Sequence, residues 1–308
     1  MSILFHPQRY FNTIGTHEPQ AFICEGESIL TSTLDARGWN NSGKSASSRG
    51  NPMTGPIFIK GACPGDMLEV RLESVVPNRS WGWSMNMLAP NVVDPETVSQ
   101  LPEAELVRWR VDMGSKLASW PESEGALGRL KLPVQPFLGC LGVAPPRGQA
   151  ISTTTSGVYG GNMDFSGFTS GVVCYFPVFA EGALFHLGDG HAVQGDGELL
   201  GTGIEISMDV RLSFRIHKDR AIDWPRGETD THLFCIGNAR PLDQAFQHAT
   251  SEMFRWLQQD YHLTAQETSL LLGQAAEYQI ANLYNPAYSV ACKIQKLYLF
   301  EICSISRG

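Results

Sequence analysis

The densest group of residues able to do chemistry lies in GDGHAVQGDGELLGTGIE, residues 188–205. Its first eleven residues contain Asp189, His191, Asp196 and Glu198, separated by glycines and small side chains. In an extended chain, side chains alternate between two faces, so Asp189 and His191 share a face, and so do Asp196 and Glu198. Carboxylates and an imidazole that converge suit a divalent metal of the zinc type. The alternative interpretation is a glycine/aspartate turn cluster that only joins strands.

Two common glycine-rich motifs do not fit this segment. A dinucleotide-binding fingerprint needs a third glycine after GxGxx and then a helix, and GDGHAV and GDGELL lack both. An EF-hand needs acidic residues at its first, third and fifth positions, and DGHAVQGDGE supplies only the first. The segment therefore favours neither a nucleotide site nor an EF-hand.

Further polar residues follow glycines or end strand-like runs. Asn162 and Asp164 lie in YGGNMDFSG, Asp35 ends the alternating run SILTSTLDA, and Asn51 ends a Ser/Gly/Asn-rich loop. Each of these residues is also common in turns. Cys140, in LGCLGVAP, has no basic neighbour that would lower its thiol pKa, so a cysteine nucleophile is not favoured.

The elements that position these residues are predicted to be mostly strands. From residue 22 to about residue 215, apolar residues fall in short runs of period two, and residues 203–218 alternate without a break. From Leu242 the apolar spacing is that of an amphipathic helix, and Thr264 with Glu267 predicts a capping box for a second helix that ends by Pro286. Residues 287–300 read as one or two strands.

We therefore expect a mostly β protein in two parts. Residues 1–240 would form the β-rich region that carries the site, and residues 241–308 a smaller α/β part containing two helices.

Composition and charge restrict the possible partners. Of 308 residues, 43% are hydrophobic and 18% charged, which is enough apolar surface for a folded protein. A net charge of −8 argues against nucleic-acid and acidic-membrane partners. Seven cysteines without a CxxC pair, no recognisable signal peptide and no apolar run of spanning length predict a cytoplasmic protein.

Four segments carry a family resemblance. NPMTGPIFIKGACPGDMLEV, PFLGCLGVAP, GGNMD and PVFAEGALFHLGDGHAVQGDGELLGTGIE occur in the order of the motifs of the acetamidase/formamidase family, which the chain resembles from about residue 35 to residue 286. The resemblance implies a β-sandwich plus a barrel-like sheet with a smaller α/β C-terminal part. It also implies hydrolysis of small linear amides, a zinc or calcium ion, and a homo-oligomer. Residues 80–130 diverge, which leaves the substrate preference open.

The positions carried over by the resemblance are Asp35, Asn51, Asp164, Asp189, His191, Asp196 and Glu198. We expect His191 with Asp35 and Asp189 to hold a metal, Glu198 being a further candidate ligand, and the metal to activate water and polarise the amide carbonyl. Glu198 is the expected general base, with Asp196 second. Asn51 or Asn162 would hydrogen-bond the amide or its oxyanion, and Asn162 and Asp164 are expected to bind substrate.

Other classes stay open at this point. A metal-independent amidase or lactamase would use a Ser, Thr or Cys nucleophile, and a non-catalytic β-sandwich would only bind metal or sugar. His186 lies in an apolar run, which favours a core position or an outer hydrogen-bond partner of a metal ligand. His17 is left unassigned.

Overall fold

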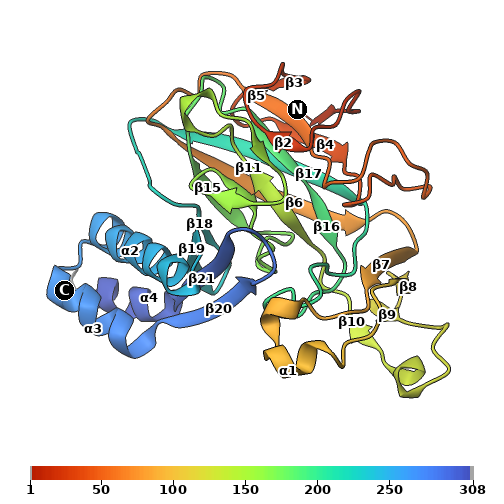
Figure 1. The fold of residues 1–308 in the computed structure, drawn as a ribbon. Coiled ribbons are helices and arrows are strands. Elements are labelled where there is room, and N and C mark those ends of the chain that lie inside the picture. Colours follow the sequence, from red (N-terminus) through yellow and green to blue (C-terminus); the bar gives the residue numbers. More distant parts are fainter. Residues whose placement is uncertain (1, 306–308) are drawn as a thin grey trace.

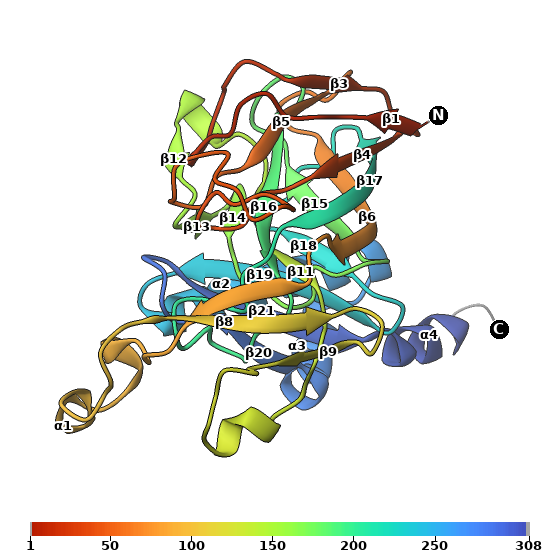
Figure 2. The same ribbon diagram turned by 90° about the vertical axis from the view of Figure 1, so that its right-hand side faces the viewer.

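The computed structural model describes residues 2–305, in which two large sheets dominate (Figures 1 and 2). The nine-stranded sheet has the order β1-β4-β17-β6-β15-β18-β19-β21-β20. Its strands are β1 (Ser2–Leu4), β4 (Ser28–Ser32), β6 (Met67–Pro77), β15 (Val173–Pro177), β17 (Met208–His217), β18 (Arg226–Glu228), β19 (His232–Ala239), β20 (Glu277–Asn282) and β21 (Tyr288–Gln295).

The second large sheet has six strands in the order β13-β14-β11-β16-β5-β3. Its strands are β3 (Ala21–Ile23), β5 (Thr54–Ile59), β11 (Phe137–Gly142), β13 (Ser156–Gly157), β14 (Gly160–Asn162) and β16 (Phe185–His191). A four-stranded sheet and a two-stranded sheet complete the β structure. They contain β7 (Trp81–Met85), β8 (Leu106–Asp112), β9 (Leu117–Ser119) and β10 (Leu132–Pro133), and β2 (Thr13–Ile14) with β12 (Ile151–Ser152).

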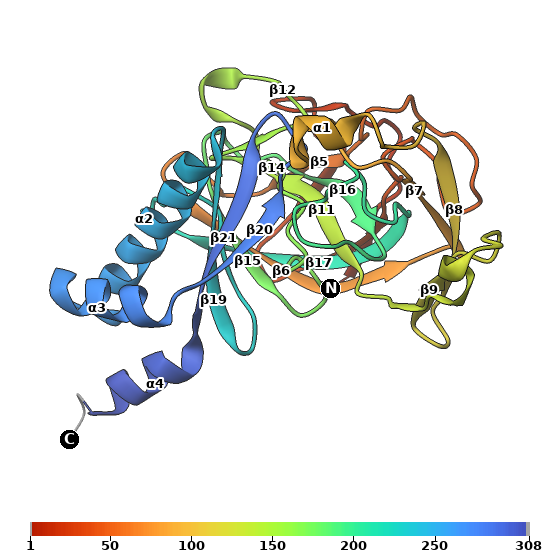
Figure 3. The same ribbon diagram turned by 60° about the horizontal axis from the view of Figure 1, so that its bottom comes forward.

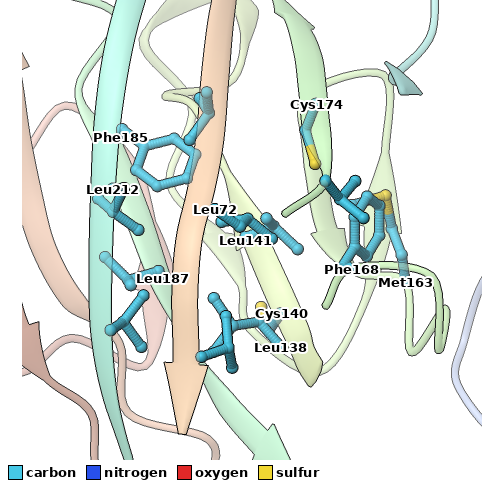
Figure 4. Packing of buried hydrophobic residues seen from close by; sticks show 14 of the residues in the cluster. Leu72, Leu138, Cys140, Leu141, Met163, Phe168, Cys174, Phe185, Leu187 and Leu212 are labelled. Carbon is cyan, nitrogen blue, oxygen red and sulfur yellow. The ribbon is translucent and has the colours of Figure 1, made fainter. Parts of the chain in front are cut away.

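The two large sheets enclose one hydrophobic core. Leu72 and Leu212 of the nine-stranded sheet meet Leu138, Leu141 and neighbouring side chains of the six-stranded sheet (Figure 4). The alternation predicted for residues 203–218 is confirmed only along β17, where Met208, Val210, Leu212 and Phe214 are buried and most of the intervening polar residues are exposed. Residues 203–207 are all buried and precede the strand. The mostly β expectation is thus confirmed as a sandwich, although each sheet of the described chain is open rather than closed into a barrel.

Helices gather at the C-terminal end of the chain, on one side of the molecule (Figure 3). They are α2 (Leu242–Tyr261), α3 (Ala265–Ala275) and α4 (Lys296–Ile305), besides a short α1 (Pro95–Val98) and three 3₁₀ turns, Pro90–Val92, Ala126–Arg129 and Pro146–Gly148. The capping box of α3 is confirmed, with Glu267 N donating to Thr264 Oγ1 (3.3 Å) and Thr264 N to Glu267 Oε2 (2.8 Å). Among the described residues, no helix is both long and apolar enough to cross a bilayer.

One expectation for the C-terminal part holds and another is wrong. The second helix does end before Pro286, at Ala275, because residues 277–282 pair with β21 as an edge strand instead of continuing the helix. Residues 296–300 are helical rather than extended, since Leu299 packs into a second hydrophobic cluster beneath α2. The described portion of this part therefore holds three helices instead of two. The boundary after residue 240 stays a prediction; pairing of β19 with β21 carries one sheet across it.

Candidate metal and active site

Five acidic or histidine side chains converge at one end of the six-stranded sheet. Asp189 and His191 come from β16, and Asp164 follows β14. Ligand atoms of Asp164, Asp189 and His191 lie within 4.8 Å of one another, and so do those of His191, Glu198 and Glu205. All five residues are buried, so a single His joins two triads in a water-poor setting. We call these five residues the acid–imidazole cluster.

Sheet register brings the first of these residues together. β11 pairs with β16, which sets Phe137 opposite His191, and it pairs on its other edge with β14, which sets Cys140 opposite Asn162. A Cβ on Gly139 would lie 2.5 Å from Asp164 Oδ1 and 2.7 Å from Asp189 Oδ2. Only a glycine at this position lets the two carboxylates approach across the strand.

Backbone conformation also differs from a regular strand at the site. Asn51, Asp164, Asp189 and Glu198 all have positive φ, between 47° and 62°. Non-glycine residues rarely adopt this conformation, and such residues concentrate at functional sites. Period-two alternation therefore holds only in part: Asp189 and His191 do meet, with Oδ1 and Nε2 3.5 Å apart.

Asp196 and Glu198, which were expected to share a face, separate. Asp196 is exposed and accepts a hydrogen bond from Gln279 (2.6 Å), whereas Glu198 is buried and its Oε2 accepts one from Asn282 (2.8 Å). The structure thus brings Glu198 into the cluster and leaves Asp196 outside it.

Asp35 does not join the cluster either. Its carboxylate accepts hydrogen bonds from Arg79 (2.5 Å), from the Trp83 indole (3.0 Å) and from two backbone N–H groups, those of Arg37 and Trp39 (3.0 Å each). Four donors saturate its oxygens, so Asp35 has no lone pair directed at the cluster.

The asparagines expected to bind substrate lie beside the cluster. Asn51 Nδ2 donates to Asn162 Oδ1 (2.7 Å) and to Thr153 O (3.1 Å), and Asn51 Oδ1 has no partner within the described chain. Asn51 therefore presents an acceptor, which suits a substrate N–H rather than an oxyanion.

Sequence reasoning missed Glu205, although it ends the motif GTGIE. Its Oε1 accepts a hydrogen bond from Gly203 N and lies 3.0 Å from His191 Nε2. An acidic residue between Ile204 and Ile206 in an alternating run was the available signal. Trp83 of the divergent 80–130 region holds the Glu205 backbone through paired N–H···O bonds of 3.1 Å and 2.7 Å.

The amides of Asn282 and Asn285 were also missed. Both donate to Asp164 Oδ2, and Asn282 donates to Glu198 as well. They reach the site from β20 and the turn after it, so no spacing in the glycine-rich segment could have indicated them.

Burial and mutual repulsion shift the pKa values of the cluster. Burial, together with the charge of Asp189, raises the pKa of Asp164 to about 7. Burial is also the main reason that the pKa of Glu205 rises to about 8 and that of Glu198 well above its ordinary value. Burial acts to lower the pKa of His191, but Glu205 and Asp189 outweigh it and raise that pKa. Protons or a cation must therefore balance this group of charges.

The polar atoms of the cluster that have no hydrogen-bond partner show whether its side chains fit a divalent cation. Within residues 2–305, Asp164 Oδ1, His191 Nε2 and Glu205 Oε2 are buried without a well-aligned hydrogen-bond partner. Buried polar atoms are normally paired, and an exception calls for an explanation such as a bound ion. Carboxylate oxygens and an imidazole nitrogen are ligands of divalent metals. The residues present fit a metal ion.

The other reactive candidates lie in unsuitable settings. Cys140 is buried, and burial with the nearby Asp189 and Asp164 raises its thiol pKa well above the ordinary value, which disfavours a thiolate nucleophile. His186 is buried, with Nε2 3.2 Å from Gly15 O, as expected for a core residue. His17 stacks on Phe11, with ring centres 4.1 Å apart.

Fold and site together define a β-sandwich protein with a buried cluster of carboxylates and an imidazole, residue types that fit a divalent cation. The sequence signature described as the Acetamidase/Formamidase family matches residues 43–156 and 147–251, and the chain belongs to this family.

Curated relatives match part of this chain, and solved structures match nearly all of it. An acetamidase of Mycolicibacterium smegmatis is 27% identical over 239 residues, covering 62% of this chain and 59% of that protein. The chain spans about half the length of the curated relatives it matches. Crystal structures of acetamidases from Bacillus halodurans (28% identity, TM-score 0.83, 97% and 99% of the chains covered) and Yersinia enterocolitica (28%, 0.84, 97% and 93%) superpose over nearly the whole chain.

Proposed function

We propose that this protein is a metal-dependent amidohydrolase, which cleaves the C–N bond of small linear amides of the formamide and acetamide type to give a carboxylate and ammonia. The observation that carries the proposal is the buried acid–imidazole cluster with its unpartnered ligand atoms, in a chain of the acetamidase/formamidase family. Curated relatives carry the names acetamidase and formamidase.

Asp164, Asp189 and His191 would hold the cation. An imidazole nitrogen favours zinc, since calcium prefers a shell of six to eight oxygens. When bound, the ion lowers the pKa of a coordinated water and polarises the amide carbonyl. Asp35 is left out of this ligand set because its oxygens are saturated.

Glu198 and Glu205 remain for proton transfer. Glu205 Oε2 is buried and unpartnered; its pKa of about 8 in the metal-free cluster would fall beside a cation, and the ionised carboxylate would then take a proton from the attacking water. Burial and Asp164 raise the pKa of Glu198, which keeps a proton on this carboxyl for the leaving nitrogen. Asn51 Oδ1 accepts an N–H of the substrate amide and orients it.

The test is ammonia release from formamide, acetamide, propionamide and a lactam by the zinc-loaded protein and by protein stripped with a chelator. We expect turnover of the linear amides, lost on stripping and restored by zinc. His191→Ala should lower kcat/KM by about 10²-fold or more. His248→Ala, a substitution on α2 remote from the cluster, is the matched control and should retain activity.

The rival mechanisms give different results. Undiminished activity in metal-free protein would favour a nucleophile-based amidase or lactamase. Zinc binding without turnover of any amide would favour a binding protein. We further propose that the protein acts in the cytoplasm as a homo-oligomer; light scattering of the purified protein tests the second point.

A further inference from the structure

Gln194 lies between His191 and two backbone carbonyl groups. Its Oε1 is 2.7 Å from His191 Nδ1, and its Nε2 is 2.8 Å from Asp164 O and 3.2 Å from Ala281 O. Carbonyl oxygens only accept hydrogen bonds, so the amide nitrogen of Gln194 must face them and its oxygen must face the imidazole. An amide oxygen also only accepts, and His191 Nδ1 must therefore carry a hydrogen.

This bond determines the role of the other ring nitrogen. His191 Nε2 points toward Glu205 Oε1 (3.0 Å) and Asp189 Oδ1 (3.5 Å), in the middle of the cluster. With Nδ1 kept as an N–H by Gln194, Nε2 is the nitrogen whose lone pair becomes available when a cation replaces its hydrogen. We propose that Gln194 is a positioning residue, which fixes the Nδ1–H tautomer of His191 and thereby reserves Nε2 for the metal.

The surroundings of the ring strengthen this assignment. The Phe137 ring meets the imidazole edge-on, with centres 5.0 Å apart. A Cβ on Gly203 would lie 2.8 Å from His191 Nδ1, so the glycine leaves room for the ring. Packing restricts the ring plane, and Gln194 supplies its polar partner at Nδ1.

Gln194 also connects separate parts of the site. Asp164 is a proposed ligand, and Ala281 precedes Asn282, whose amide donates to Asp164 and Glu198. One side chain therefore ties His191 to the Asp164 backbone and to strand β20 of the other sheet. Partners of this kind behind a metal ligand typically change metal affinity about 10–100-fold when removed.

The experiment compares Gln194→Met with Gln194→Glu. Methionine has a similar length but no amide oxygen for Nδ1–H, whereas glutamate keeps an acceptor for Nδ1–H, loses the two N–H donors and adds an ionisable group. Nitrogen NMR of histidine-labelled, zinc-loaded protein identifies His191 by the signals absent from His191→Ala. We expect a hydrogen-bonded Nδ1–H in the wild type and in Gln194→Glu, and its loss in Gln194→Met.

Zinc affinity, measured by competition with a chelator, is the second readout. We expect the zinc dissociation constant of Gln194→Met to rise about 10–100-fold and that of Gln194→Glu to change less. Retention of both the Nδ1–H signal and wild-type zinc affinity in Gln194→Met would overturn the assignment. Should that variant not fold, loss of the Nδ1–H signal in Gln194→Glu would overturn it equally.

The positioning role of Gln194 rests on the metal site of the proposed function but not on amide turnover. Absence of hydrolysis in the wild type would contradict the proposed function while the Nδ1–H signal still decides the role of Gln194. Likewise, amide hydrolysis by a wild-type protein that lacks the Nδ1–H signal would support the proposed function and refute the positioning role of Gln194.

Discussion

Asp35 and the acid–imidazole cluster are both buried, but the oxygens of Asp35 all have hydrogen-bond donors and some oxygens of the cluster have none. Asp35 receives four donors, including the Arg79 guanidinium, which also contacts Trp81 O (2.8 Å) and Asn40 O (3.2 Å). In the cluster, Asp164 and Glu205 each keep one oxygen without a partner in the described chain. A saturated buried carboxylate fixes the fold, whereas an unsatisfied one costs free energy that a ligand can offset.

Hydrogen-bond saturation therefore separates structural from functional acids without reference to conservation. Both kinds occur in glycine-rich, turn-rich segments, and the sequence alone does not tell them apart: Asp35 was expected to bind metal, Asp164 to bind substrate, and Glu205 was missed. Removing a saturated acid should lower stability, and altering an unsatisfied one should change ligand binding more than stability.

The largest expected effect comes from breaking the buried ion pair between Asp35 and Arg79. Asp35→Ala leaves the Arg79 guanidinium buried and unpaired, and breaking such a pair costs about 3–5 kcal/mol of unfolding free energy. Urea unfolding followed by tryptophan fluorescence measures the loss. At a temperature where the variant is folded, it should still bind zinc with wild-type stoichiometry.

Glu25→Ala is the control for this prediction. The Glu25–Arg215 pair is 3.8 Å long and its side chains are 51% and 67% exposed, so solvent screens it and no measurable change is expected. If Asp35→Ala abolished zinc binding in folded protein, the division between structural and functional acids would fail at this residue.

Crowding the unsatisfied acids should have a smaller effect on stability and a clear one on binding. In Gly139→Ala the new methyl group would lie 2.5 Å from Asp164 Oδ1 and 2.7 Å from Asp189 Oδ2, which forces the carboxylates apart. We expect a stability loss of about 1–3 kcal/mol, typical of overpacking, and weaker zinc binding by calorimetry.

Gly195→Ala provides the matched control, since a Cβ there has no heavy atom within 4 Å. It should leave stability and zinc affinity near the wild-type values. Equal zinc affinity in both glycine variants would show that the approach of Asp164 and Asp189 over Gly139 is not needed for the cation.

Replacing an acid of the cluster with a neutral residue should raise the stability of the metal-free protein, whereas Asp35→Ala should lower it. Asp164 has an ordinary pKa near 3.8, raised to about 7 by burial and by Asp189. The carboxyl therefore favours the fold fully below pH 3.8, and this contribution is lost as the pH rises through 7. An asparagine side chain does not ionise, so we expect Asp164→Asn to stabilise the metal-free protein at pH 8 by about 1 kcal/mol.

Unfolding of metal-free protein in urea at pH 4 and pH 8 measures this difference. The gain of Asp164→Asn over wild type should be larger at pH 8 than at pH 4, while its zinc affinity falls. A loss of stability at pH 8 would place Asp164 with the saturated acids instead.

The sequence predicted part of the site because the relevant residues are close together along the chain. Asp189, His191 and Glu198 lie within one glycine-rich segment, and turn motifs together with the family resemblance indicated Asp164 and Asn51. The two side-chain donors to Asp35 could not be foreseen in the same way, because Arg79 and Trp83 are more than forty residues away. The family resemblance therefore made Asp35 an expected ligand.

Alternation failed where the backbone leaves the extended region. Glu198 has φ of 48°, so the period-two pairing with Asp196 does not apply there. For the fold, regular alternation identified β17 and a capping box identified the start of α3. The end of α3 depends on the pairing of residues 277–282 with β21, a tertiary interaction that local signals do not contain.

An effect as small as that of Asp164→Asn, but of opposite sign, is predicted for Asp66, a saturated acid near the surface. It accepts hydrogen bonds from Cys63 N (2.8 Å), Asp219 N (3.1 Å) and Lys218 Nζ (2.8 Å). Burial acts to raise its pKa, but these bonds outweigh burial and hold the pKa below 3.8. Its stabilising contribution is therefore present above pH 3.8 and is lost as the pH falls through the lowered value.

Asp66→Asn should consequently lower stability at pH 7 by about 1 kcal/mol, since Lys218 is exposed and its attraction is screened by solvent. At the acid end of the titration the variant and the wild type should converge, because the protonated Asp66 has lost the same interactions. Urea midpoints measured from pH 7 down to the acid end of the titration test this. A difference that stays as large throughout as at pH 7 would mean that the loop 61–66 depends on side-chain shape rather than on the charge of Asp66, and the hydrogen-bonded carboxylate would not be its stabilising element.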